Sequence, residues 1–305
     1  MIQIFLLTGF LGAGKTTLLQ RLLKSYEDRK IGVIVNEFGE INVDARMVEK
    51  EGIEMAELSN GSIFCACIKD KFVDGLIEMF DRDLEILFIE ASGLADPANM
   101  GHILDGIRNK TKDIYLLRGS ICVVDGENFL KMADVLPALQ NQVAYANVVI
   151  VNKADLVNEK TISAVSEKIN EINSDVYIMT TSYCKVDLRE ITDNFSTILK
   201  ESKETSNTYE SRPTSFVLKA SDPLSHDKLV EFLNEIAPQT FRIKGFAETD
   251  KGCEEVNGVV ENVILKKWEG TSKGTEIVVI SSIGIKMLSI ITAASSKYLE
   301  GRLKL

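Results

Sequence analysis

Residues 9–16 constrain the fold of this chain more than any other part of its sequence. They read Gly-Phe-Leu-Gly-Ala-Gly-Lys-Thr, a complete match to G-x-x-x-x-G-K-[ST], and they lie between an apolar run and a helical pattern. Glycines at positions 9, 12 and 14 let the backbone curl so that successive N–H groups face a phosphate at the start of a helix. The sequence therefore predicts a strand, a phosphate-binding loop (P-loop) and a helix, in that order.

Side chains at the end of this loop complete the predicted phosphate site. Lys15 should reach the β and γ phosphates, Thr16 should offer its hydroxyl to Mg²⁺, and Thr17 should contact the α phosphate. The residues expected to contact the nucleotide here are Gly9, Gly12, Ala13, Gly14, Lys15, Thr16 and Thr17. Such a site binds a nucleoside triphosphate together with its magnesium ion.

A carboxylate, that of Glu90, lies near the end of another mainly apolar run, residues 86–91. A magnesium–nucleotide site needs such a group at the end of a neighbouring strand, so Glu90 is expected to hold the metal through water. Gly93 can bring its N–H group close to the γ phosphate, as a switch loop does. An acidic residue after a strand is often only a loop charge, and the P-loop is what favours the metal-binding interpretation.

Residues 152–155, Asn-Lys-Ala-Asp, follow the apolar run 148–151 and predict which base is bound. The carboxylate of Asp155 can accept hydrogen bonds from N1–H and the 2-amino group of guanine, which adenine does not offer in that form. The four-residue match is weak by itself and gains weight from its place after a strand, downstream of the P-loop. Asn152, Lys153 and Asp155 are therefore expected to bind the guanine of GTP or GDP.

Short apolar runs alternate with longer amphipathic stretches through the first two thirds of the chain. The runs are 2–8, 31–36, 86–91, 121–125, 148–152 and 176–180, with helical patterns such as 16–26 and 160–173 between them. This order predicts an α/β domain over residues 1–200, a P-loop NTPase with a mainly parallel doubly wound sheet.

A polar segment at residues 201–213 ends at a proline and is expected to link two domains. Beyond it, extended runs at 214–219, 241–247, 256–268 and 276–281 alternate with helical patterns at 225–237 and up to Leu299. Residues 214–305 are therefore predicted to form a small α+β domain. Polar residues interrupt the apolar stretch 277–294, so it is expected to be a strand and a helix rather than a membrane span.

Charge and cysteine content limit the partners and the compartment. Lys and Arg total 35 against 45 Asp and Glu, and the net charge of −10 argues against binding to nucleic acid or an anionic membrane. Five cysteines, an odd number, suit a reducing compartment better than a disulfide framework. No basic segment precedes the apolar start, so we expect a cytoplasmic protein without a signal peptide.

Together these motifs resemble the CobW-type GTPases, the cobalamin-synthesis family allied to metallochaperones for urease and hydrogenase. The matching stretches are residues 8–17, 36–40, 90–97 and 152–156, with residues 241–246 and Trp268 in the C-terminal module. The resemblance implies GTP hydrolysis and a switch segment at residues 36–44. Within it, Glu37 and Asp44 are candidates to orient the attacking water or the Mg²⁺ shell, although a turn after a strand would explain the same residues.

The sequence departs from that family at the transition-metal motif. Family members usually carry C-x-C-C after Asn-Gly, whereas residues 60–68 here read Asn-Gly-Ser-Ile-Phe-Cys-Ala-Cys-Ile. Without a gap, the first two family cysteines fall on Ser62 and Phe64. Only Cys65 then matches, and Cys67 is an addition.

Two thiols spaced C-x-C can still bind one ion such as Zn²⁺ or Co²⁺. The remaining ligands would come from water, a second subunit, Glu37, Asp70 or a client protein, and such an open shell suits transfer. The alternative is a pair of small buried apolar residues. The two histidines, His102 and His226, are expected to be ordinary surface or capping residues, and the other three cysteines, Cys122, Cys184 and Cys253, are expected to be structural or incidental.

Two functions follow from these expectations. The first is a GTP-driven metallochaperone or metallocentre-maturation protein that delivers Zn²⁺ or Co²⁺ to a client. The second keeps the GTPase as a switch that activates a corrinoid or other cofactor-dependent client without metal transfer, which the altered cysteine motif favours. Turnover is expected to be slow, because no arginine finger can be assigned, and a partner or a homodimer would complete the site.

Overall fold

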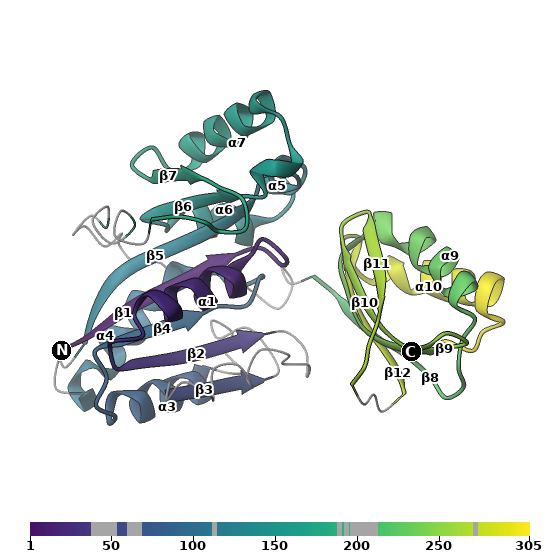
Figure 1. Ribbon diagram of the computed structural model, residues 1–305, viewed down its shortest axis with the longest axis horizontal. Coiled ribbons are helices and arrows are strands. Elements are labelled where there is room, and N and C mark those ends of the chain that lie inside the picture. The colour runs from purple at the N-terminus through teal and green to yellow at the C-terminus, as the bar shows by residue number, and fades with distance from the viewer. Residues whose placement is uncertain are drawn as a thin grey trace. The chain divides into compact units, whose positions relative to one another are not determined.

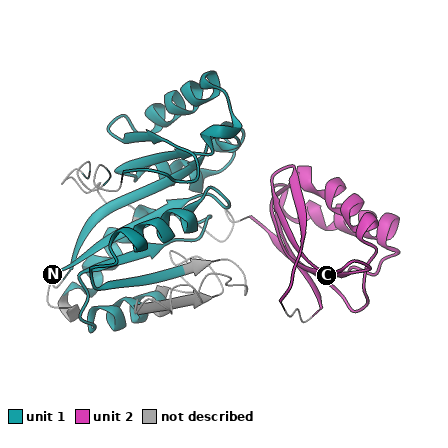
Figure 2. Cartoon of the chain, in the orientation of Figure 1, with its two compact units in different colours: residues 1–211 teal, residues 212–305 magenta. Residues whose placement is uncertain are grey.

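The structure is a computed structural model that describes residues 1–37, 54–59, 69–111, 115–187, 191, 195, 213–270 and 274–305 (Figure 1). For residues 36–37, 54–59, 69–71, 99 and 109–111 it describes the backbone alone. The chain divides into two compact units, residues 1–211 and 212–305 (Figure 2). Each unit has its own sheet and its own apolar core.

The first unit is built on one parallel sheet. Its strands are β1 (Ile2–Gly9), β2 (Ile31–Glu37), β3 (Glu54–Ser59), β4 (Ile86–Glu90), β5 (Tyr115–Asp125), β6 (Val148–Asn152) and β7 (Tyr177–Thr180). They lie in the order β3-β2-β4-β1-β5-β6-β7, and every neighbouring pair is parallel. The predicted fold class is confirmed, although β3 and the first half of β5 were not predicted from the sequence.

Helices cover both faces of this sheet. They are α1 (Lys15–Ser25), α3 (Lys69–Phe80), α4 (Met100–Thr111), α5 (Phe129–Ala133), α6 (Pro137–Ala144) and α7 (Glu159–Ile172). Successive side chains of a strand point to opposite faces. In β1, Ile4 and Leu6 pack with α3 and α4, whereas Phe5 and Leu7 pack with α1. The sheet is therefore doubly wound, as its buried apolar runs predicted.

Parallel pairing brings the carboxyl ends of several strands to one edge of the sheet. Leu7 of β1 is paired with Glu90 of β4, and Gly9 is paired with Val123 of β5. Asp125, at the end of β5, is paired with Asn152, at the end of β6. Ligands of open α/β sheets bind outside this edge, so the topology gathers the predicted nucleotide residues there.

The second unit is a five-stranded antiparallel sheet with two helices on one face. Its elements are β8 (Ser215–Ala220), α9 (His226–Ile236), β9 (Thr240–Thr249), β10 (Gly252–Val259), β11 (Asn262–Lys267), β12 (Thr275–Ser281) and α10 (Met287–Leu299). The strand order is β11-β10-β9-β12-β8. The predicted α+β class is confirmed, and the apolar stretch 277–294 is a strand followed by a helix.

One predicted element of this unit is wrong. Residues 256–268 were expected to be a single extended run, but they form the hairpin β10–β11, in which Val259 is paired with Asn262. The turn lacks glycine and proline, and Val260 adopts a left-handed φ of 52° that is rare for a β-branched residue. Valines stand on both sides of the turn, at positions 256, 259, 260 and 263, so the whole stretch was interpreted as one extended run.

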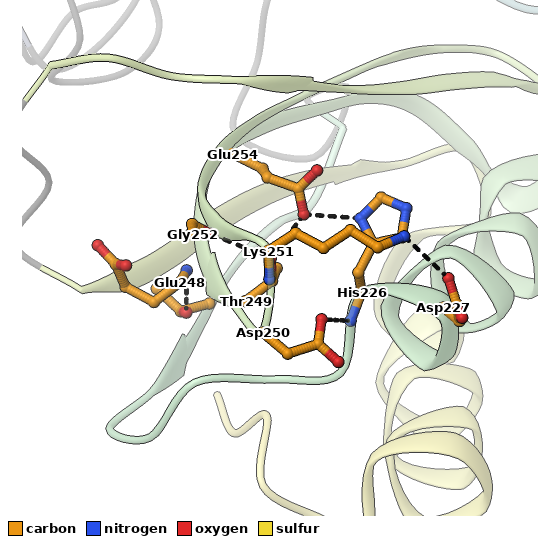
Figure 3. Close-up of polar contacts among 9 residues, drawn as sticks. His226, Asp227, Glu248, Thr249, Asp250, Lys251, Gly252 and Glu254 are labelled. Atoms are coloured by element: carbon orange, nitrogen blue, oxygen red, sulfur yellow. Dashed lines mark hydrogen bonds and ion pairs between the residues drawn. The ribbon is translucent and has the colours of Figure 1, made fainter.

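His226 fastens α9 to the hairpin β9–β10 (Figure 3). Its Nδ1 lies 2.7 Å from Oε2 of the buried Glu254, and the hydroxyl of Thr249 donates to the same oxygen at 2.7 Å. The backbone N–H of His226 donates to Oδ1 of Asp250 at 2.9 Å. These contacts give His226 a structural role at the start of α9. No helix among the described residues has the length and apolar composition to cross a membrane.

Candidate nucleotide site

The P-loop between β1 and α1 is closed by glycines in conformations that side chains rarely adopt. Gly9, Gly12 and Gly14 have φ angles of 133°, 74° and 117°. A Cβ atom at Gly14 would lie 2.4 Å from Nδ2 of Asn152. The φ angle of Gly14 favours glycine, and the loop packs closely on the side chain of Asn152 at the end of β6. The loop leads into the N-terminus of α1, which favours an anion.

Lys15 is the first residue of α1, and its ammonium group lies against the loop. Only 8% of the residue is exposed. Nζ donates to the carbonyl oxygens of Gly9 at 3.0 Å and Phe10 at 3.2 Å. A buried cation is therefore held at the loop, where the P-loop motif requires one.

The side chains of Thr16 and Glu90 are in contact, although the two residues are 74 positions apart in the sequence. The Thr16 hydroxyl donates to Oε1 of Glu90 at 2.9 Å, and Glu90 is the buried last residue of β4. A hydroxyl and a carboxylate are hard oxygen ligands, which fit Mg²⁺. Thr17 follows on α1 and is half-buried.

Asn152 joins the P-loop to a second loop. Its Nδ2 donates to the carbonyl of Ala13 at 2.8 Å, and its Oδ1 accepts from the backbone N–H of Cys184 at 2.9 Å. The next residue, Lys153, has a left-handed φ of 63° and donates through Nζ to Oδ2 of the buried Asp125 at 2.7 Å. Residues 152–153 are thus hydrogen-bonded to the P-loop, to the loop that contains Cys184 and to the end of β5.

Asp155 is the last residue of the motif 152–155. It is exposed, and its backbone N–H donates to Oγ of Ser182 at 3.0 Å. An exposed carboxylate beside a P-loop can accept hydrogen bonds from a ligand. The structure thus brings together the P-loop, Glu90 and the three predicted base-binding residues at one edge of the sheet.

Residues 181–185, which follow β7, belong to this site and were missed from the sequence. Tyr183 and Cys184 have φ angles of 55° and 51°, and such strained positions cluster at functional sites. The Cys184 thiol lies 3.4 Å from the carbonyl oxygen of Gly14, and burial raises the pKa of this thiol to about 12. The available signal was the position of Thr181 and Ser182 directly after a strand.

Gly93 lies directly against the P-loop. A Cβ atom at this position would be 2.5 Å from the backbone nitrogen of Leu11, so a side chain cannot be accommodated without a shift of the loop. Gln142, a second residue that the sequence analysis missed, donates to the carbonyl of Gly93. The segment after Glu90 is therefore packed closely on the phosphate loop.

Several predicted site residues lie outside the described part of the chain. They are Asp44, Cys65 and Cys67, and the side chains of Glu37 and Asp70. Within the described residues no group of three or more His, Cys, Asp or Glu side chains could hold a metal ion. His102 is an exposed residue of α4.

The sheet topology, the P-loop and the contact between Thr16 and Glu90 define a P-loop nucleotide-binding protein. Residues 3–180 match the family model described as CobW/HypB/UreG, nucleotide-binding domain. Residues 214–290 match the model of the cobalamin synthesis protein cobW C-terminal domain. The chain therefore belongs to the CobW/HypB/UreG family, as the resemblance in its motifs predicted.

The chain is similar to curated relatives over part of their length. Zinc-regulated GTPase metalloprotein activator 1 of Dictyostelium discoideum is 27% identical over 297 residues, which cover 81% of this chain and 62% of that protein. The zinc chaperone YjiA of Escherichia coli is 33% identical over 195 residues, 61% of this chain and 59% of that protein. The chain thus spans about three-fifths of the length of these relatives.

One solved structure covers nearly the whole chain. The crystal structure of Zn(II)-bound YjiA GTPase from E. coli is similar with a TM-score of 0.50 and 25% sequence identity. The match covers 97% of this chain and 98% of that one. It extends the likeness over both units of the chain.

Proposed function

We propose that this protein binds and hydrolyses GTP and couples its nucleotide state to the handling of Zn²⁺ or Co²⁺ for a client metalloprotein. The observation that carries the proposal is the P-loop with Lys15 buried at it and Thr16 in contact with Glu90. The three groups have the charges and oxygen ligands that a magnesium-bound triphosphate needs. The zinc relatives support the metal part of the proposal.

In hydrolysis, water attacks the γ phosphorus of GTP, the bond to the β-phosphate oxygen breaks, and GDP and phosphate leave. Lys15 turns from the loop carbonyls to the phosphates and offsets the charge on them. Thr16 and Glu90 would hold Mg²⁺, which would supply Lewis-acid polarisation of the phosphate oxygens. Gly93 brings its N–H to the γ phosphate, while Glu37 and Asp44 are candidates to orient the water.

Cys65 and Cys67 are proposed to hold the cargo metal in the GTP state and to release it after hydrolysis. Two thiolates leave positions for water, a second copy of the chain or the client, which suits transfer. Thiolate ligands need a reducing compartment, so we place the protein in the cytoplasm. Turnover is proposed to be slow until the client or a second subunit completes the site.

One observation favours a second function, a GTPase switch that activates a cofactor-dependent client without carrying metal. Ser62 and Phe64 stand where the family motif has cysteines. If the remaining thiols are too few to hold an ion, nucleotide-driven changes of the switch segment would act on the client alone. Metal binding separates the two functions.

Replacing Asp155 with Asn should change the preferred base. The carboxylate that accepts from N1–H and the 2-amino group of guanine is lost, whereas an amide can donate to O2 of xanthine and accept from its N1–H. We expect kcat/KM for GTP to fall about 100-fold and that for xanthosine triphosphate to rise. Steady-state phosphate release with both nucleotides checks this. Asp175→Asn, an exposed change before β7, is the control, and equal use of GTP and ATP by the wild type would contradict guanine selection.

Metal binding should depend on the nucleotide. Equilibrium dialysis of Zn²⁺ or Co²⁺ with Mg²⁺ and a non-hydrolysable GTP analogue should give about tenfold tighter binding than with GDP. The difference should vanish in the Cys65→Ser/Cys67→Ser variant and persist in Cys253→Ser, which alters a thiol of the second unit. By linkage, the metal should tighten the GTP analogue by the same factor. Equal binding in all states would leave the switch without metal transfer.

A further inference from the structure

Helix α6 directs two side-chain amides at the segment that follows Glu90. Nε2 of Gln142 donates to the carbonyl of Ala95 at 2.9 Å and to that of Gly93 at 3.2 Å. Nδ2 of the preceding residue, Asn141, donates to Oδ2 of Asp96 at 3.1 Å. Residues 93–96 are therefore held by consecutive residues of one helix.

Apolar packing alone does not explain a glutamine at position 142. It is fully buried, and among the described residues its Oε1 has no hydrogen-bond partner. A methionine would fill a similar volume without a buried polar group, and an unpaired buried carbonyl is unfavourable. The two hydrogen bonds from Nε2 are therefore what this side chain contributes.

The helix that carries Gln142 is itself fixed. Nδ2 of Asn173, at the end of α7, donates to the carbonyls of Val143 at 2.9 Å and Ala146 at 3.0 Å. These two bonds satisfy acceptors at the C-terminal end of α6, where a helix leaves carbonyls open. Gln142 thus projects from a support that is tied to the neighbouring helix.

The segment is also held at its far end and against the P-loop. Asp96 is fully buried and accepts from the N–H of Ala98 through Oδ1 at 3.0 Å. Gly93 lies so close to Leu11 that a Cβ atom would be 2.5 Å from the Leu11 nitrogen. Gly93 is therefore packed against the phosphate loop, and a small shift of its backbone would change the distance between the two.

We propose that Gln142 is a positioning residue for hydrolysis, which fixes Gly93 through its carbonyl oxygen so that the N–H group of the same residue meets the γ phosphate. The inference rests on the proposed GTPase function and assigns to α6 a role in the reaction at the sheet edge. Gln142 does not touch the substrate and acts through the two carbonyls that it holds. GDP lacks the γ phosphate, so GDP affinity should be insensitive to this residue.

The test is the Gln142→Met variant, which removes both donors and keeps the volume. We expect kcat for GTP hydrolysis to fall at least about tenfold, because small misplacements at a reaction centre have large effects on rate. KM for GTP and Kd for GDP should change less than about twofold. Gln140→Met is the matched control, since Gln140 lies on the same helix and donates instead to the carbonyl of Ala133 at 2.7 Å.

A second variant, Gln142→Glu, tests the same contacts by pH. The protonated carboxyl can donate one hydrogen bond to a carbonyl, whereas the carboxylate repels both, so kcat of this variant should rise as the pH falls. The ratio of its rate to that of the wild type supplies the readout, and Gln140→Glu should show a flat ratio. This variant decides the matter if Gln142→Met does not fold.

The outcomes separate the inference from the function beneath it. If the wild type hydrolyses GTP and Gln142→Met retains its kcat, the positioning role is wrong while the GTPase stands. An equal loss of kcat and GDP affinity, with a flat pH ratio for Gln142→Glu, assigns Gln142 to the fold alone and also overturns the inference. A wild type without GTP hydrolysis removes both proposals together.

Discussion

Replacing Lys15 with Met should lower kcat for GTP hydrolysis by about 10²–10³-fold, the effect of removing one group that stabilises transition-state charge. Lys15 is the cation held at the P-loop, where its Nζ lies 3.0 Å from the carbonyl oxygen of Gly9. Methionine keeps the aliphatic part of the side chain in its buried position and removes the charge. Phosphate release under saturating GTP and Mg²⁺ measures the change.

The control is Lys24→Met, which removes an exposed lysine from the last turn of the same helix. It should leave kcat within about twofold, because surface substitutions far from a site have small effects. Circular dichroism spectra should show that both variants keep the fold. Hydrolysis by Lys15→Met at the wild-type rate would mean that the reaction does not use this loop.

Replacing Gly9 with Ala should destabilise the first unit by about 4 kcal/mol. Two features of the structure combine at this position. The φ angle of 133° is one that alanine rarely adopts, and the new Cβ would lie 2.2 Å from the carbonyl oxygen of Val123 in β5. The oxygen belongs to the backbone of a buried neighbouring strand, so it cannot rotate away as a side chain could.

Urea unfolding followed by circular dichroism measures this loss. Gly106→Ala is the matched control, because its Cβ would meet nothing within 4 Å on α4, and alanine there should stabilise the helix by about 0.5–1 kcal/mol. The only tryptophan, Trp268, lies in the second unit, so its fluorescence transition should stay in place. An unchanged circular dichroism transition for Gly9→Ala would contradict the close approach of the two strands.

The fold class could be predicted because its signals are local. Buried parallel strands are continuous apolar runs, and the P-loop is a contiguous motif whose glycines have a conformational reason at each place. Strand β3 escaped because its sequence, Glu-Met-Ala-Glu-Leu-Ser, has neither a continuous apolar run nor β-branched residues. The turn at Val260 was missed because the polar residues Glu261 and Asn262 lie between valines, and the β-branched Val260 is an unusual residue for a left-handed turn position.

The sequence indicated the candidate site residues that belong to contiguous motifs, but not those that join the site only through long-range contacts. Thr16 and Glu90 were expected to share a metal, and the structure brings their side chains together. The roles of Gln142 and Cys184 depend on contacts with residues 49 and 170 positions away, respectively, and no local pattern encodes such distances. Long-range contacts of this kind emerge only from the packed fold.

The side-chain amide of Asn152 also affects how a nucleotide is recognised. Its Nδ2 donates to the carbonyl of Ala13 and its Oδ1 accepts from the N–H of Cys184, so one side chain joins the P-loop to residues 181–185. A nucleotide that reaches both loops is a two-point ligand, and its second contact forms at high effective concentration once the first is made. Free base and free phosphate lack that advantage. The site should therefore recognise the intact nucleotide far better than the sum of its fragments.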